Sequence, residues 1–89
     1  MELRIDFPRL PPEKDLLTIR GELDAILEDD GWLIGSGRTG DGGFVELELE
    51  EEKQNPKYGI LAVKNYLQRG GFDPYTTMEL AGVKTRIFE

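Results

Sequence analysis

The residues whose spacing most resembles a chemical motif lie at positions 35–43, which read Gly-Ser-Gly-Arg-Thr-Gly-Asp-Gly-Gly. Gly35, Gly37 and Gly40 match the G-x-G-x-x-G fingerprint of dinucleotide-binding proteins. That motif requires a helix directly after the glycines, because the pyrophosphate binds at the helix N-terminus. Residues 44–47, Phe-Val-Glu-Leu, alternate in polarity as a strand does instead. The match is therefore weak, and no P-loop lysine follows it.

The same nine residues contain five glycines, which allow three interpretations. The first is a hairpin turn, since glycine adopts the positive φ values that turns need. The second is contact with a partner, because two residues suffice for a hairpin and a longer loop costs more entropy to order. The third is a small-anion nest of backbone N–H groups beside Arg38. Arg38, Thr39 and Asp41 supply the polar side chains of the predicted tip.

Residue types that catalyse reactions or bind metals are scarce. The sequence has no histidine and no cysteine, which removes the usual zinc ligands, a neutral-pH base and a thiol nucleophile. Ser36 is the only serine, and no base lies near it in the sequence. The acidic runs at residues 29–30 and 50–52 lack calcium-loop spacing. We therefore predict no catalytic residue, metal site or cofactor, and a hydrolase would need a pocket holding a carboxyl group of raised pKa.

The net charge of −7 is unevenly distributed over the 89 residues, which we expect to form a single domain, residues 1–89. Residues 1–52 carry 15 acidic and 5 basic residues, and residues 53–89 carry 3 acidic and 6 basic residues. The acidic half argues against nucleic acid and permits a basic protein partner. No membrane partner is expected, because no apolar run approaches about 20 residues. The start of the chain lacks signal-peptide features, so we expect a cytoplasmic protein.

The elements that would position these residues follow from hydrophobic periodicity. Residues 2–7 alternate as a half-buried strand, and a helix is predicted from Pro12 or Glu13 to about residue 29, with Gly31 as its left-handed stop. Strands are predicted at residues 32–37 and 44–50.

A second helix begins at Asn55-Pro56 in this prediction, with Asn55 as the N-cap. Gly70 is then the residue after the helix end, and Phe72 makes the closing apolar contact. The last strand covers residues 77–88. Its apolar residues change phase between Leu80 and Val83, which predicts a β-bulge or a kink at Gly82.

The predicted order βαββαβ favours an α+β, ferredoxin-like fold. We expect a four-stranded antiparallel sheet in the order 4-1-3-2, with two helices on one face. The other face should carry charged side chains, with Arg4 between an acidic third strand and a basic last strand. Cross-strand ion pairs worth about 0.2–1 kcal/mol each are expected there. A face so rich in glutamate would repel RNA.

The hairpin pattern Gly-x-Gly-x-Thr-Gly-x-Gly-Gly at residues 35–43, followed by an alternating acidic strand, resembles a group of small bacterial single-domain proteins of unknown function. Some proteins of this kind look like immunity proteins that neutralise toxins. The resemblance covers most of the chain in layout, but only the hairpin in actual motif. Ferredoxin-like families of known chemistry do not match, since there is no Cys-x-x-Cys pair and no acylphosphatase-type loop after the first strand.

These observations favour a small acidic interaction module, of inhibitor or immunity type, that binds a basic protein. Its candidate interaction residues come from the hairpin and the strand after it: Gly37, Arg38, Thr39, Asp41, Glu46 and Glu48. The alternative hypothesis is a ligand-sensing regulatory domain that forms a homodimer through an edge strand of its sheet.

Overall fold

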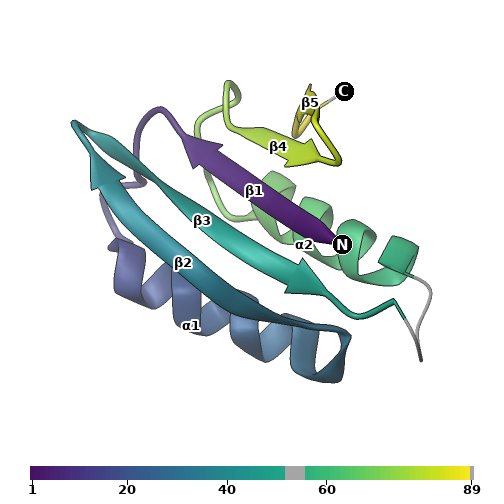
Figure 1. Ribbon diagram of the computed structural model, residues 1–89. Coiled ribbons are helices and arrows are strands. Elements are labelled where there is room, and N and C mark those ends of the chain that lie inside the picture. The colour runs from purple at the N-terminus through teal and green to yellow at the C-terminus, as the bar shows by residue number, and fades with distance from the viewer. Residues whose placement is uncertain (52–55, 89) are drawn as a thin grey trace.

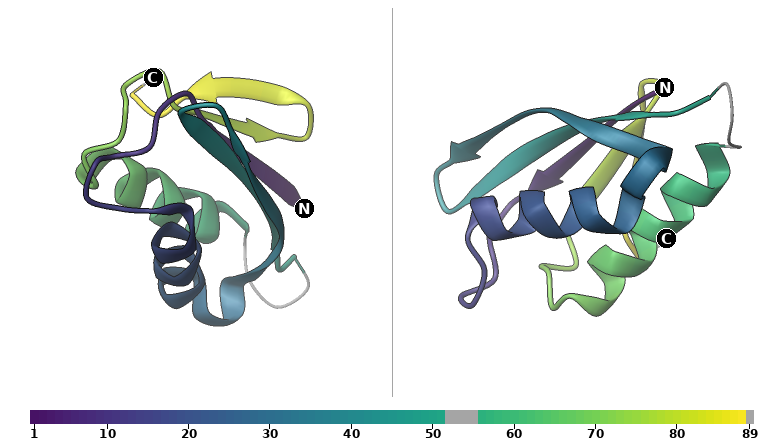
Figure 2. Two further views of the ribbon diagram at one scale, coloured as in Figure 1. Left: turned by 90° about the vertical axis from the view of Figure 1, so that its left-hand side faces the viewer. Right: turned by 90° about the horizontal axis from the view of Figure 1, so that it is seen from below.

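The computed structural model describes residues 1–51 and 56–88. Its elements, in chain order, are β1 (Glu2–Phe7), α1 (Leu16–Leu27), a 3-10 turn η1 (Glu28–Asp30), β2 (Gly31–Thr39), β3 (Gly42–Leu49), α2 (Pro56–Arg69), β4 (Thr77–Leu80) and β5 (Val83–Arg86). The strands form one antiparallel sheet in the order β2-β3-β1-β4-β5. Both helices lie on the same face of this twisted sheet (Figure 1, Figure 2).

The α+β class is confirmed, but the predicted four-stranded order 4-1-3-2 is not matched exactly, because β5 adds a fifth strand beyond β4. The single last strand with a bulge at Gly82 is also wrong. Ala81 and Gly82 have φ values of 51° and 82°, and Leu80 pairs with Val83 across them. Positive φ at both central residues defines a type I′ hairpin turn. The change of phase in the sequence therefore marks a reversal of the chain, and Val83, expected in the core, is exposed.

Ala81 is a poor residue for this turn, because a left-handed conformation costs most L-residues about 1–2 kcal/mol. We expect Ala81→Asn to raise the free energy of unfolding by about 0.5–1 kcal/mol, since asparagine tolerates that conformation best among non-glycine residues. Urea denaturation would measure the change. Ala81→Val should be destabilising, and equal stabilities of the two variants would contradict the turn assignment.

Helix α1 is shorter than predicted at both ends. It begins at Leu16 because the Asp15 side chain caps it, accepting a 2.8 Å hydrogen bond from the backbone N–H of Thr18. It ends at Leu27 because Glu28 has a φ of 49°. Gly31 is extended, so its predicted role as the left-handed stop is wrong.

The end of α2 follows the predicted pattern with one shift. The residue with positive φ is Gly71, at 75°, and not Gly70. The predicted closing contact of Phe72 is confirmed: its ring centroid lies 5.5 Å from that of Tyr66 and 5.3 Å from that of Phe7. Asn55, the predicted N-cap, lies outside the described residues.

The core lies between the helices and one face of the sheet. Alternate residues of β1 and β3 point into it, as predicted, and one stripe of each helix covers them. The buried apolar side chains are Leu3, Ile5, Phe7, Ile19, Leu23, Leu27, Val45, Leu47, Leu49, Val63, Leu67, Phe72, Met78 and Ile87. No helix in the described ranges is long and apolar enough to span a bilayer.

Candidate functional site

The glycine-rich stretch is mostly β-structure and not a long loop. Thr39 pairs with Gly42, so only Gly40 and Asp41 form the turn, and Gly40 has a φ of 57°. Glycine with positive φ at the first central position is the pattern of a type II′ hairpin turn. The expectation of an extended, entropically costly loop is therefore wrong.

Close packing explains two of the remaining glycines. A Cβ atom at Gly37 would lie 2.8 Å from the Phe44 ring, which covers this position. A Cβ atom at Gly42 would overlap the carbonyl oxygen of Phe7, where the chain leaves β1 beside the hairpin. Packing within the chain therefore accounts for glycine at these two positions.

Two polar groups of the hairpin tip already form hydrogen bonds within the chain. Arg38 donates a 3.2 Å hydrogen bond from Nε to the carbonyl oxygen of Gly42. The carbonyl oxygen of Asp41 accepts a 3.0 Å bond from the backbone N–H of Leu10. The side chains of Thr39 and Asp41 are exposed. The tip therefore anchors the loop between β1 and α1 and presents few side chains.

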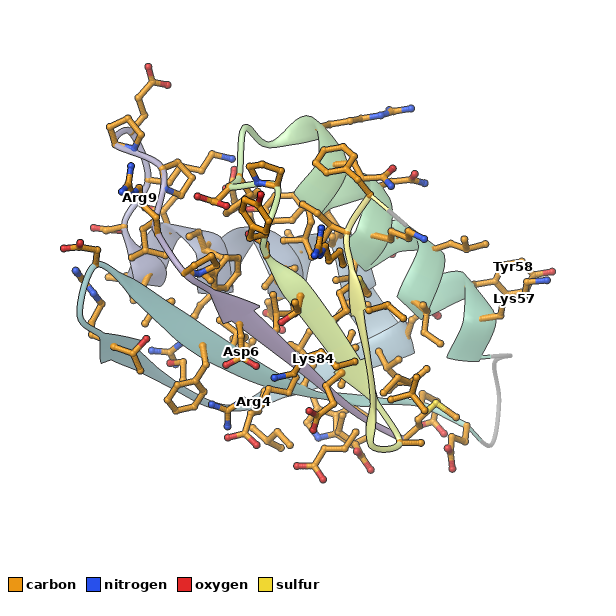
Figure 3. The ribbon with its side chains drawn as sticks, turned by 90° about the horizontal axis from the view of Figure 1, so that it is seen from above. Arg4, Asp6, Arg9, Lys57, Tyr58 and Lys84 are labelled. Carbon is orange, nitrogen blue, oxygen red and sulfur yellow. The ribbon has the colours of Figure 1, made fainter. Side chains whose placement is uncertain are left out.

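The other candidate residues, Glu46 and Glu48, lie on the open face, which is the sheet face that the helices leave uncovered. The strand register aligns Glu46, Arg4, Glu79 and Lys84 in one row across β3, β1, β4 and β5. Opposite charges therefore alternate along this row. Figure 3 shows Arg4 and Lys84 on this face, with the Lys84 side chain extending toward Asp6.

Arg4 is held by three neighbours. Its Nε lies 3.1 Å from Asp6 Oδ1, and its Nη1 lies 4.0 Å from Glu46 Oε1. Its guanidinium carbon lies 4.3 Å from the centroid of the Phe44 ring, within the range of a cation–π contact. The predicted ion pair with the acidic strand is confirmed. The predicted basic neighbour is wrong, because Glu79 stands directly opposite Arg4 and Lys84 is one strand further away.

Acidic side chains gather at the end of the open face where β1 begins. A hollow of about 530 Å³ there is lined by Met1, Glu2, Arg4, Glu46, Glu51, Glu79, Ala81 and Gly82. We call it the acidic hollow, because four of these residues carry a carboxylate, against the guanidinium of Arg4 and the α-ammonium of Met1. Glu48 stands opposite Glu2 in the next row of the sheet. Like charges at this spacing repel. The Met1 α-ammonium lies 3.4 Å from Glu48 Oε1 and 3.2 Å from Glu51 Oε1, so the chain itself offsets part of this repulsion.

The β2 edge is the outer side of strand β2. The predicted order 4-1-3-2 also places the second strand at an edge, but the exposed apolar side chains along it were not predicted. The side chains of Trp32 and Ile34 are 46% and 51% exposed. Trp32 stands opposite Glu48, and Gly35 stands opposite Glu46. The register shifts between Leu33 and Gly35, so Ile34 is an extra residue in the strand. The sequence feature that could have indicated this exposed apolar surface is a tryptophan at the start of an amphipathic strand.

A second group of polar side chains joins the two helices on the covered side of the sheet. Glu22 Oε1 accepts a 2.7 Å hydrogen bond from the Tyr66 hydroxyl and lies 3.0 Å from Lys14 Nζ. These two donors lower the pKa of Glu22. Burial, together with the nearby carboxylate, raises the pKa of Tyr66. A groove of about 450 Å³ beside them is lined by Lys14, Ile26, Ala62, Asn65, Tyr66, Arg69 and Gly70.

The lowered pKa of Glu22 predicts a pH-dependent stability. A carboxyl group with a folded-state pKa below its ordinary value of 4.5 stabilises the fold above that pH, and the stabilisation is lost as the pH falls through the folded-state pKa. We expect Glu22→Gln to be less stable than wild type near pH 7, with a difference that shrinks below about pH 4.5. Thermal unfolding between pH 3 and pH 7 would measure it; a constant difference would contradict the prediction.

Within residues 1–51 and 56–88, no group of three or more Asp, Glu, His or Cys side chains is arranged to hold a metal ion. Thr76 is the only buried polar side chain in these ranges, and its Oγ1 has no hydrogen-bond partner. The described carboxyl groups with a shifted pKa, Asp15 and Glu22, both shift downward.

The fold and this site define an α+β protein with an acidic, uncovered sheet face. Comparison with protein-family models, with curated proteins and with solved structures finds no match to the chain.

Proposed function

We propose that the protein is an acidic interaction module that binds a basic protein through its open face. The observation that carries this proposal is the acidic hollow, where the carboxylates of Glu2, Glu46, Glu51 and Glu79 outnumber its two cationic groups, the Arg4 guanidinium and the Met1 α-ammonium. These carboxylates are solvent-accessible, so a basic partner would exchange their water for charge-assisted hydrogen bonds. An inhibitor or immunity-type protein that neutralises a basic toxin is the specific form of this proposal.

The proposal also covers the fold family to which the protein is related and its location in the cell. We interpret β1 to β4 and the two helices as a ferredoxin-like βαββαβ unit, with β5 as an addition at the sheet edge. We also propose kinship with the small bacterial proteins that share the glycine-rich hairpin, and action in the cytoplasm.

Capture from an extract of the source cells would test the proposal. The full chain would be immobilised as wild type, as Glu46→Gln/Glu48→Gln, and as Glu13→Gln/Asp24→Asn. Both double variants remove two negative charges, but the second changes exposed acids near or on α1, away from the open face. We expect a basic protein on the wild type and the second variant only, released at about 0.5 M salt because salt screens exposed charges.

Equal capture by both variants would mean that net charge alone attracts the protein. Absence of any basic protein on the wild type would overturn the proposal.

The second candidate is a ligand-sensing domain, which the groove between α1 and α2 favours. Lys14, which also pairs with Glu22, and Arg69 give this groove cationic side chains for an anionic group. A thermal-shift panel of anionic metabolites, with sedimentation for the oligomeric state, would separate the two functions. A stable dimer together with one stabilising metabolite would favour the sensing domain.

A further inference from the structure

We propose that the β2 edge is where the partner docks, and that the docking element is an extended segment rich in lysine or arginine, which pairs with β2 as an added strand. This inference rests on the proposed function and names the partner chemistry and the binding mode. Strand addition at a sheet edge uses main-chain hydrogen bonds for affinity and side-chain contacts for specificity.

The first observation is that β2 is a long edge strand. It has nine residues and, within the part of the chain that the structure describes, pairs only with β3, so one side of its backbone has no strand partner there. Natural proteins usually protect such an edge with charged residues, proline or a short strand. β2 has no proline, and its one charged residue, Arg38, lies near the turn. Trp32 and Ile34 instead expose apolar surface along it.

The second observation concerns Gly35, which lies in the row of Glu46. A Cβ atom at Gly35 would lie 3.6 Å from Glu46 Oε1, which also lies 4.0 Å from Arg4 Nη1, so this carboxylate oxygen stands between Arg4 and the glycine. Because Gly35 has no side chain, a cationic side chain on an added strand could reach Glu46 across β2. In the neighbouring row, Glu48 stands opposite Trp32. The face of the Trp32 indole ring attracts cations.

Charge favours a segment rich in lysine or arginine over a second copy of the chain as the strand that pairs with β2. Two copies paired through β2 would each bring a net charge of −7, and their Glu46 carboxylates would approach the same seam. The other edge strand, β5, has only four residues and carries Lys84 and Arg86, which would repel a basic segment.

The test uses synthetic peptides and the full chain labelled with ¹⁵N. The probe is acetyl-(Thr-Lys)₄-amide, which is an alternating strand with lysines on one face. Its control has the same charge but carries N-methyl groups on alternate backbone amides, so that one edge cannot donate hydrogen bonds. We expect the probe to shift the backbone amide resonances of β2, and the methylated peptide to bind at least about tenfold more weakly because it cannot complete the ladder.

The matched variants are Glu46→Gln and Asp24→Asn, which remove one charge each; Asp24 is exposed on α1, away from the open face. We expect Glu46→Gln to weaken binding of the probe about three- to fivefold and Asp24→Asn to change it less than twofold. Equal binding of both peptides, or shifts confined to β1 and β4, would overturn strand addition while leaving the proposed function standing. A chain that dimerises through β2 without peptide would also overturn it, and failure of every basic probe to bind would count against the proposed function itself.

Discussion

Replacing Gly42 by alanine is expected to lower the free energy of unfolding by about 3 kcal/mol or more, or to prevent folding. The residue is buried, and its added methyl group would overlap the backbone of Phe7 and Pro8. Backbone cannot rotate away as a flexible side chain can, so β1 and β3 would have to separate near the pair Phe7 and Gly43. Urea denaturation followed by circular dichroism would measure the loss.

Gly40→Ala is the matched control, because it makes the same change two residues away in the same hairpin. Its Cβ atom would meet no atom within 4 Å, so only the φ of 57° opposes alanine. We expect a loss of about 1 kcal/mol. If Gly42→Ala lowered the free energy of unfolding as little as Gly40→Ala, the close contact between Gly42 and the backbone at the end of β1 would be wrong.

Replacing Phe72 by alanine should lower the free energy of unfolding by about 3–5 kcal/mol. The ring is 5% exposed and packs between Tyr66 of α2 and Phe7 of β1. It therefore joins the end of the helix to the end of the first strand, and its removal leaves a cavity at that junction.

Phe88→Ala provides the control, because the same atoms are removed from a side chain that is 58% exposed. We expect a change within about 0.5 kcal/mol. Calorimetric or chemical unfolding of both variants would measure the contrast. Similar losses for the two would show that Phe72 does not close the core as described.

Local periodicity predicted the elements well where one face of an element is buried and the other is solvated. The alternation of β1 and β3 identified their core residues, and the pairing of Arg4 with Glu46 followed from it. The pattern failed at residues 77–88, because a reversal of the chain and a β-bulge produce the same change of phase in a sequence. The positive φ of Ala81 distinguishes them, and alanine gives no local signal for it.

The candidate site was predicted only in part. Glu46 and Glu48 lie on the uncovered face as expected, because alternation decides which face a strand residue occupies. Gly37 and Arg38 contact Phe44 and Gly42 of the same hairpin, and their contact with a partner stays a prediction. The edge position of the second strand was predicted by the order 4-1-3-2, but the exposure of Trp32 and Ile34 along it was not, since that depends on how the side chains pack in the folded chain.

The sequence by itself determined the α+β class, the core positions of the central strands, and the acidic character of one sheet face. Each of these depends on residues close together in the chain or on composition. The tertiary structure decided why residues 35–43 are rich in glycine, because the reason at Gly42 is the backbone of Phe7, 35 positions earlier. It also decided which carboxylates meet in the acidic hollow, since three different strands must pair before those side chains converge.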